Sequence, residues 1–198
     1  MLKPKYKTVA ICGGEGSGKS TYCNMLKDYV KKNNIECLLT REPGGTKIGE
    51  DNTEMCPETE LLLFMASRTQ HLKEKVIPEM KKGKLIIFDR FYLSSLVYQG
   101  FVRGIDIKKI WEIHKISTNG FITDLNIVID VPVEVGLERI NKNNRKTNRL
   151  DNETLEFHKK VREGYLYFVD NDYFGKTIAI NGNRKKEDVF KDIVNTIF

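Results

Sequence analysis

The sequence predicts an α/β fold in which helices cover both faces of a five-stranded parallel sheet. Short apolar segments alternate with longer segments of helical periodicity along the 198 residues. Wholly apolar strands are typical of parallel sheets that are buried on both faces. A glycine-rich loop at residues 13–20 joins the first apolar segment to the first amphipathic one. Because no repeat or linker interrupts the alternation, we expect a single domain over residues 1–198.

The first half of the chain predicts three strands with helices between them. The helix after the first strand runs to about Asn33, because its apolar side chains recur at helical spacing. Pro57 suits the first turn of the next helix, whose strongly amphipathic part spans 60–76, and Pro78 interrupts or ends it. The expected strands of this half are 8–12, 35–40 and 85–88.

The second half predicts two further strands among five helical segments. Pro132 lies near the start of one helix, where its fixed backbone angle is tolerated. Residues 142–152 have no periodicity and many Asn, Lys and Arg residues, so we expect a mobile lid there. The expected strands are 125–129 and 177–180, and the expected helices are 94–99, 106–118, 133–141, 153–170 and 186–198.

Composition narrows the class of protein and of partner. The formal net charge is +6, but the basic clusters lack interleaved aromatic residues, so we expect no nucleic-acid partner. No apolar run approaches the length of a membrane span and no signal peptide is visible, so we expect no membrane partner. The four cysteines have no C-x-x-C spacing, which is typical of a reduced, cytoplasmic chain.

The loop itself carries the strongest functional signal. It matches G-x-x-x-x-G-K-[ST], in which backbone N–H groups surround phosphate oxygens at the start of a helix. Lys19 should reach the β- and γ-phosphates of a nucleoside triphosphate, and Ser20 should ligate Mg²⁺. The pattern predicts a P-loop NTPase fold. The expected ATP-binding residues are Gly13, Gly14, Glu15, Gly16, Ser17, Gly18, Lys19, Ser20 and Thr21.

Charged side chains follow the carboxyl ends of other predicted strands. Since ligands bind at that edge of a parallel sheet, we expect these side chains to meet the loop in one cleft. Asp89 would reach Mg²⁺ through water, as a Walker-B carboxylate does. Arg41, Arg68 and Arg90 would bind phosphate groups, because guanidinium groups pair with them in a bidentate fashion. Arg145 and Arg149 would close over the transferring group from the lid.

Several stretches, taken together, resemble the thymidylate kinase family over nearly the whole chain. They include GGEGSGKST at 13–21, TREPGGT at 40–46, ETELLLFMASRTQH at 58–71 and DRFYLSSLVYQG at 89–100. TREPGGT together with the DR-x-x-x-S-x-x-x-YQG pattern is highly specific to that family. The resemblance implies the reaction ATP + dTMP → ADP + dTDP with Mg²⁺, in a homodimer whose candidate interface is the helix at 60–76.

The resemblance also implies roles at the acceptor. Arg41 and Arg90 would hold the 5′-phosphate of dTMP, Phe64 would stack on thymine, and Arg68 would bond its carbonyl edge. Tyr98 would exclude a ribose 2′-hydroxyl. From the residues alone, a core position is the more ordinary interpretation of Phe64. The dTMP-binding set is Glu15, Arg41, Phe64, Arg68, Arg90, Ser94, Ser95, Tyr98 and Gln99.

The resemblance places the remaining catalytic groups in the lid and the phosphate loop. No basic residue precedes Lys19 in the loop, so the catalytic arginine should come from the lid, as in bacterial-type members. Arg149 matches the lid best and Arg145 second, and Glu15 would lie near the acceptor 3′-hydroxyl or the metal. Arg162 and Tyr165 match the helix behind the lid, and adenine would lie near residues 181–184. The expected catalytic set is Lys19, Arg90, Arg149, Arg145 and Glu15.

The chain departs from the family pattern at three places. Cys12 stands where Glu is usual, Asn181 replaces an expected Asp, and the segment at 50–55 is shorter than usual. A more open acceptor pocket would tolerate dUMP analogues such as 5-hydroxymethyl-dUMP. Two functions of other classes remain as alternatives: a regulatory NTP-binding module, for which the chain lacks an N-K-x-D motif, and a nucleic-acid-stimulated ATPase.

Overall fold

The computed structural model contains a five-stranded, all-parallel sheet, as the sequence predicts. It describes residues 2–42, 56–142, 153–171 and 174–198. The strand order is β2-β3-β1-β4-β5, so the chain runs from β1 to the edge strand β2, returns through β3 and passes β1 to reach β4 and β5. The strands are β1 (Thr8–Cys12), β2 (Cys37–Arg41), β3 (Leu85–Asp89), β4 (Leu125–Asp130) and β5 (Thr177–Asn181).

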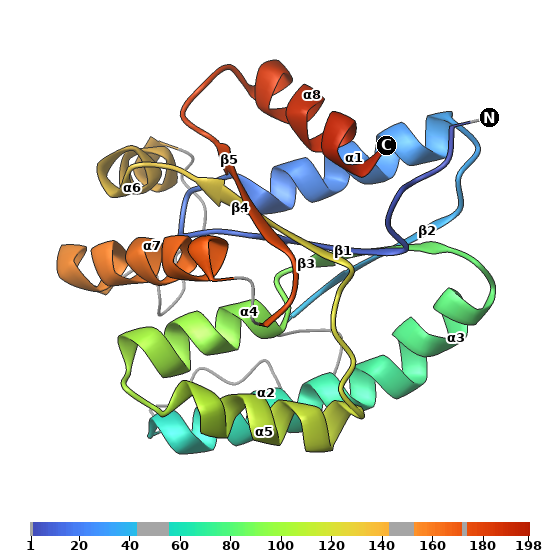
Figure 1. Ribbon diagram of the computed structural model, residues 1–198. Coiled ribbons are helices and arrows are strands. Elements are labelled where there is room, and N and C mark those ends of the chain that lie inside the picture. The colour runs from blue at the N-terminus through green and yellow to red at the C-terminus, as the bar shows by residue number, and fades with distance from the viewer. Residues whose placement is uncertain (1, 43–55, 143–152, 172–173) are drawn as a thin grey trace.

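Helices cover both faces of the sheet (Figure 1). The α-helices are α1 (Lys19–Lys32), α2 (Pro57–His71), α3 (Ile77–Lys81), α4 (Tyr92–Ser95), α5 (Ile107–Thr118), α6 (Val133–Lys142), α7 (Leu155–Asp170) and α8 (Lys186–Ile197). Two π-helical segments, η2 (Leu72–Val76) and η3 (Leu96–Val102), continue α2 and α4. Among the described helices, none combines the length and the apolar composition that crossing a lipid bilayer requires.

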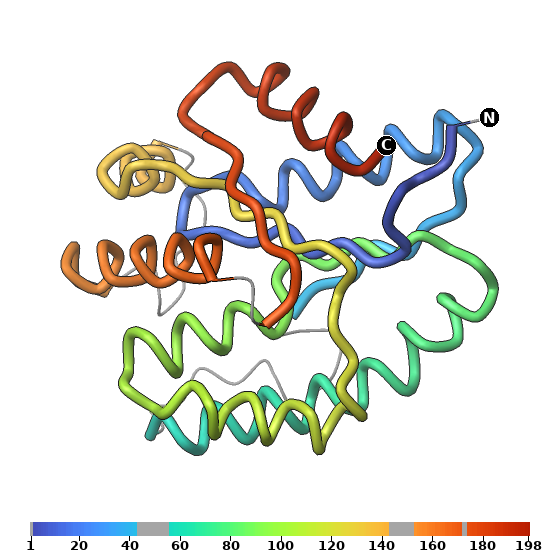
Figure 2. The backbone as a smooth tube through the Cα atoms, viewed as in Figure 1, coloured from blue at the N-terminus to red at the C-terminus, as the bar shows by residue number. Residues whose placement is uncertain are grey.

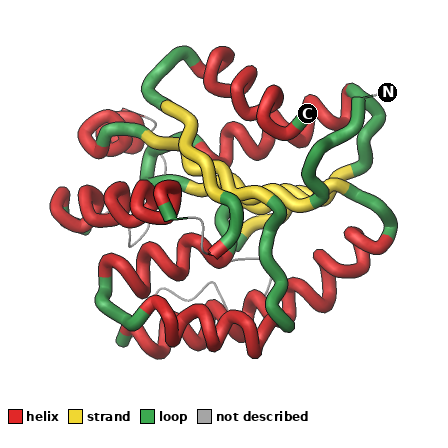
Figure 3. The backbone as a smooth tube through the Cα atoms, viewed as in Figure 1, coloured by secondary structure: helices red, strands yellow, loops and turns green. Residues whose placement is uncertain are grey.

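The alternation of side chains along β1 divides the core into two layers. Val9 and Ile11 pack with α1 and α8, whereas Ala10 and Cys12 pack with α2, the α4–η3 segment and α7. Figure 3 shows these helical layers on opposite sides of the strands. The two ends of the chain lie side by side (Figure 2), because the amide of Lys5 donates to the carbonyl of Ile197 at 2.8 Å.

Most predicted elements are confirmed. The larger differences lie where an α-helix continues as a π-helix, and one strand begins later than predicted. Pro78 does not end the helical path that begins at Pro57, because the π-helical turn η2 precedes it and α3 carries the path to Lys81. A π turn shifts the backbone hydrogen bonds by one residue, which accommodates the missing N–H of proline. The predicted helix at 94–99 extends from Tyr92 to Val102, with its second part π-helical. The second strand begins at Cys37 rather than at residue 35.

Candidate active site

The loop between β1 and α1 has the backbone that its glycines predict. Gly16 has φ +69°, and a Cβ there would lie 2.0 Å from the carbonyl oxygen of Gly136 in α6. Gly13 has φ +145°, and its Cβ would lie 2.7 Å from the carbonyl oxygen of Ile129. Only glycine fits such positions, since other residues avoid positive φ and would overlap these carbonyl groups. The loop is therefore fixed against the ends of β4 and α6.

Two polar side chains of this loop remain incompletely satisfied. The hydroxyl of Ser17 is buried and has no hydrogen-bond partner among the residues that the structure describes. The buried amine of Lys19 donates to the carbonyl of Gly14 at 2.9 Å and lies 3.7 Å from the Glu15 carboxylate. Burial lowers the pKa of Lys19 from its ordinary value near 10.5 to about 8, and the positive charge of Arg90 acts in the same direction. An incoming polyanion would satisfy the hydroxyl and stabilise the ammonium group.

The predicted metal ligands Ser20 and Asp89 lie together. The Ser20 hydroxyl donates to the Asp89 carboxylate at 2.5 Å, at the start of α1 and the end of β3. Mg²⁺ prefers such oxygen ligands and keeps several waters alongside substrate phosphates. This pair therefore fits a Mg²⁺ ion that is carried by a nucleotide in the loop.

Arg90 joins the phosphate loop to the other half of the cleft. It follows β3 with φ +66°, and its guanidinium forms an ion pair with Glu15. The same group donates to the hydroxyls of Tyr98 at 3.1 Å and Tyr165 at 3.3 Å. Tyr98 in turn donates to Glu15 at 3.1 Å. Lys19, Glu15, Arg90 and Tyr98 thus form one continuous set of contacts.

Burial keeps Tyr98 of this set, and the nearby Cys12, uncharged. It raises the pKa of Tyr98 well above its ordinary value, so the hydroxyl stays protonated and can donate. It also raises the pKa of Cys12 to about 11. A neutral thiol therefore stands behind the phosphate loop, at the place where the resemblance implies a carboxylate. Ser94, also expected at the acceptor, shares a 2.9 Å hydrogen bond with the hydroxyl of Tyr165.

Arg68 lies in a buried network that the sequence did not predict. Its Nε donates to Glu42 at 2.6 Å, and its Nη2 donates to Ser95 at 3.0 Å. The second oxygen of Glu42 lies 3.1 Å from Nδ1 of His71, whose Nε2 lies 2.6 Å from the hydroxyl of Thr40. Because a carboxylate only accepts hydrogen bonds, Nδ1 of His71 is the donor to Glu42. Arg68 is therefore hydrogen-bonded to its counter-charge, whereas the Lys19 amine lies 3.7 Å from the carboxylate of Glu15.

The remaining acceptor residues differ in exposure. Phe64 is partly exposed and belongs to neither hydrophobic cluster of the described residues, so the core interpretation does not hold. Arg41 is exposed at the carboxyl end of β2. Gln99 is buried, and its amide donates to Glu60 at 2.8 Å, while Arg103 donates to the same carboxylate at 2.9 Å. Glu42, Glu60 and His71 lie in the stretches TREPGGT and ETELLLFMASRTQH, which carry the resemblance, whereas Arg103 lies in neither.

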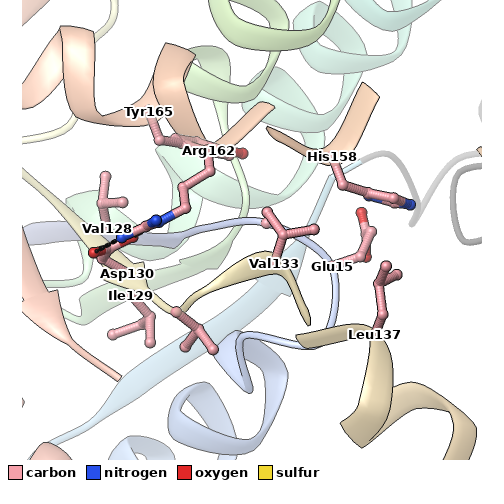
Figure 4. A pocket seen from close by; sticks show the side chains of 11 residues that line it. Glu15, Val128, Ile129, Asp130, Val133, Leu137, His158, Arg162 and Tyr165 are labelled. Atoms are coloured by element: carbon pink, nitrogen blue, oxygen red, sulfur yellow. Dashed lines mark hydrogen bonds and ion pairs between the residues drawn. The ribbon is translucent and has the colours of Figure 1, made fainter. Parts of the chain in front are cut away.

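A small cavity adjoins the phosphate loop on its other side (Figure 4). It lies between Glu15, the end of β4, α6 and α7, and Arg162 forms a bidentate ion pair with Asp130 at its base, at 2.7 and 3.0 Å. His158 also lines it, with a buried Nε2 that has no hydrogen-bond partner in the described part of the chain. The sequence indicated Arg162 and Tyr165 at this place but not His158, which stands alone in the sequence.

Some predicted residues lie outside the described part of the chain. These are the lid arginines Arg145 and Arg149, the rest of the TREPGGT stretch after Glu42, and the shortened segment at 50–55. Their predicted roles stay predictions.

Comparison with known proteins gives one consistent answer. The family model described as thymidylate kinase matches residues 11–193. A thymidylate kinase of Clostridium novyi (strain NT) is 47% identical over 195 residues, which cover 93% of this chain and 95% of the relative. The thymidylate kinase of Geobacillus thermodenitrificans (strain NG80-2) is 40% identical over 93% of this chain and 86% of its own length. That of Carboxydothermus hydrogenoformans is 41% identical over 94% of each chain.

Proposed function

The chain belongs to the thymidylate kinase family, and we propose that it transfers the γ-phosphoryl group of ATP to dTMP, giving ADP and dTDP. The observation that carries the proposal is the set of contacts from Lys19 through Glu15 to Arg90 and Tyr98. These contacts join a triphosphate cradle to the residues expected at a nucleotide acceptor. Phosphoryl transfer needs such alignment and charge neutralisation more than it needs covalent chemistry.

The donor would bind through residues 13–21. The backbone N–H groups of the loop and the Lys19 amine would hold its phosphates, and the buried Ser17 hydroxyl would gain a partner. Ser20 would bind Mg²⁺ directly and Asp89 through water. The ion would neutralise charge between the phosphates.

The acceptor would bind on the far side of Arg90. Arg90 and Arg41 would hold its 5′-phosphate, Phe64 would stack on thymine, and Arg68 would donate to the base carbonyl. The partial exposure of Phe64 on α2, one turn before Arg68, supports this arrangement. Ser94, Ser95, Tyr98 and Gln99 would line the base and sugar.

Arginine from the lid would complete the site during transfer. We place Arg149 first and Arg145 second in that role, with Glu15 beside the acceptor 3′-hydroxyl.

The enzyme would act as a cytoplasmic homodimer of single-domain chains, with α2 as the candidate interface. The exposed Leu62 of α2, with 56% of its surface accessible, supports that interface.

A coupled ADP-release assay across all nucleoside monophosphates tests the proposal. We expect ADP formation that requires Mg²⁺ and dTMP, with weaker or no turnover for ribonucleotides. ADP formation that is indifferent to dTMP, or stimulated by DNA, would contradict it.

A further inference from the structure

The α2 helix presents a row of three side chains toward the segment that follows β3. Glu60, Phe64 and Arg68 recur every four residues and therefore share one helix face. Glu60 contacts Gln99 in η3, and Arg68 contacts Ser95 in α4. Because these pairs lie at the two ends of the row, Phe64 lies between them. A base stacked on Phe64 would have Arg68 near one part of its edge and Gln99 near another.

Arg68 and Gln99 would both contact the hydrogen-bonding edge of the base, but they differ in whether each side chain can only donate or can also accept hydrogen bonds. Arginine can only donate hydrogen bonds, so Arg68 selects a carbonyl oxygen whatever its orientation. The amide of Gln99 is ambiguous, since a rotation by half a turn exchanges a donor for an acceptor at nearly the same position. Thymine offers a donor at N3–H, whereas cytosine offers an acceptor at N3. The orientation of the amide therefore decides which base it accepts.

Glu60 removes that ambiguity. Its ionised carboxylate accepts hydrogen bonds but cannot donate them, so the NH₂ group of Gln99 must face it, at 2.8 Å. Arg103 donates to the same carboxylate at 2.9 Å and forms an ion pair with it. Glu60 and Gln99 are each only 3% exposed, so little water competes for these bonds.

The carbonyl oxygen at the other end of the Gln99 amide remains available to accept a hydrogen bond. The carbonyl oxygen of Gln99 has no hydrogen bond within the described residues. It is also not among their fully buried unpartnered atoms, which are Ser17 Oγ, His114 Nδ1 and His158 Nε2. It therefore keeps some accessible surface on the side away from Glu60.

We propose that Glu60 is a positioning residue that fixes the Gln99 carbonyl oxygen as an acceptor for N3–H, and so selects thymine-type bases over bases with an unprotonated N3. The inference rests on the proposed function and names a determinant of its substrate class. Glu42 plays the corresponding part for Arg68 by holding its guanidinium in place, but it does not change what Arg68 can bond.

The test uses a pair of acceptors that differ only on the edge that is read. One is dUMP, whose edge is the same as that of dTMP. The other is 2-pyrimidinone deoxyribonucleoside monophosphate, which has an unprotonated N3 and no group at C4, so Arg68 neither bonds nor repels it. We expect Glu60→Gln to raise kcat/KM for this analogue relative to dUMP by about tenfold or more. The ratio of dTMP to dUMP should stay unchanged, because both have N3–H.

Two controls separate positioning from a general structural effect. Glu58→Gln, at an exposed position on the same helix, should leave both ratios unchanged. Gln99→Met should raise the analogue-to-dUMP ratio by itself, and Glu60→Gln should then add nothing to it, because its effect passes through Gln99. This second variant also keeps the test valid if Glu60→Gln fails to fold, as a thermal melt would reveal.

The outcomes are distinct. If Glu60→Gln or Gln99→Met lowers turnover of all acceptors equally and leaves the analogue-to-dUMP ratio as it was, the positioning role is wrong. If the unmodified enzyme forms no ADP with dTMP, the proposed function itself has failed. A raised ratio that persists in the Glu60→Gln/Gln99→Met double variant would place the effect of Glu60 elsewhere.

Discussion

The two halves of the cleft differ in how closely their positively charged side chains are paired with carboxylates. The donor half comprises residues 13–20, apart from Glu15, together with Asp89; within the described residues its Ser17 hydroxyl has no partner, and the Lys19 pKa is lowered. The acceptor half comprises Arg68, Arg90 and Gln99 with their carboxylate partners, which are Glu42, Glu15 and Glu60 respectively. Lys19 is paired only loosely, with the Glu15 carboxylate 3.7 Å away, and can attract any polyphosphate, whereas closely paired groups hold one geometry. This difference suits a general donor and a particular acceptor.

Removing the central charge of the donor half should give the largest effect. Lys19→Ala deletes an amine that stabilises charge on the transferring phosphates, so we expect kcat to fall by about 10²- to 10³-fold. Steady-state kinetics with ATP and dTMP measures it. Lys31→Ala, in the exposed last turn of α1, is the matched control and should be neutral. A near-normal kcat for Lys19→Ala would contradict the assignment of the donor half.

The backbone of the donor half should be equally sensitive to substitution. Here the effect should appear in the free energy of unfolding rather than in kcat. Gly16→Ala combines φ +69° with a Cβ only 2.0 Å from the Gly136 carbonyl oxygen. We expect it to lower the free energy of unfolding by about 2–4 kcal/mol. Gly14→Ala meets nothing within 4 Å and should change it by less than about 0.5 kcal/mol. Chemical denaturation compares the two variants, and equal stabilities would show that the loop does not depend on α6.

The donor half was more predictable from the sequence than the acceptor half. The phosphate loop is a local motif, and Asp89 ends an apolar strand, so sheet topology alone brings it to the loop. The partner of Gln99 is Glu60, which is 39 positions away on another helix, and no local pattern encodes that pairing. The π-helical winding of η3 also sets where Tyr98 and Gln99 point, and residue propensities do not predict it.

A milder change in the acceptor half should reduce activity without abolishing it. Tyr98→Phe removes a hydroxyl that accepts from Arg90 and donates to Glu15, while the two charged groups keep their own ion pair. We expect kcat/KM for dTMP to fall about tenfold, the value of one hydrogen bond to a charged group. We also expect weaker exclusion of ribothymidine monophosphate. Tyr167→Phe, with its ring 45% exposed, is the control. A fall as large as that of Lys19→Ala would show that the acceptor half is not held by redundant contacts.

The smallest expected effect is the uptake of a fraction of a proton when a nucleotide binds. This uptake tests the difference between the donor half and the acceptor half directly. Burial lowers the Lys19 pKa to about 8 in the free protein, so close to half of the molecules carry a neutral amine at pH 8. Bound triphosphate would raise that pKa, because nearby negative charge favours the ammonium form. Binding at pH 8 should therefore take up about half a proton per site. Calorimetry in two buffers with different ionisation enthalpies measures it.

Lys19→Arg is the reference for this measurement, because arginine stays charged and adds no uptake of its own, while protonation of the nucleotide is common to both proteins. The lowered pKa of Lys19 also determines whether this residue makes the free energy of unfolding rise or fall with pH. Without nucleotide, the native chain binds fewer protons at Lys19 than the unfolded chain between pH 8 and 10.5, so this residue makes stability rise with pH across that window. If the protein and Lys19→Arg show equal uptake, Lys19 is already charged in the free protein. The donor half would then be as fully paired as the acceptor half, and the contrast between them would disappear.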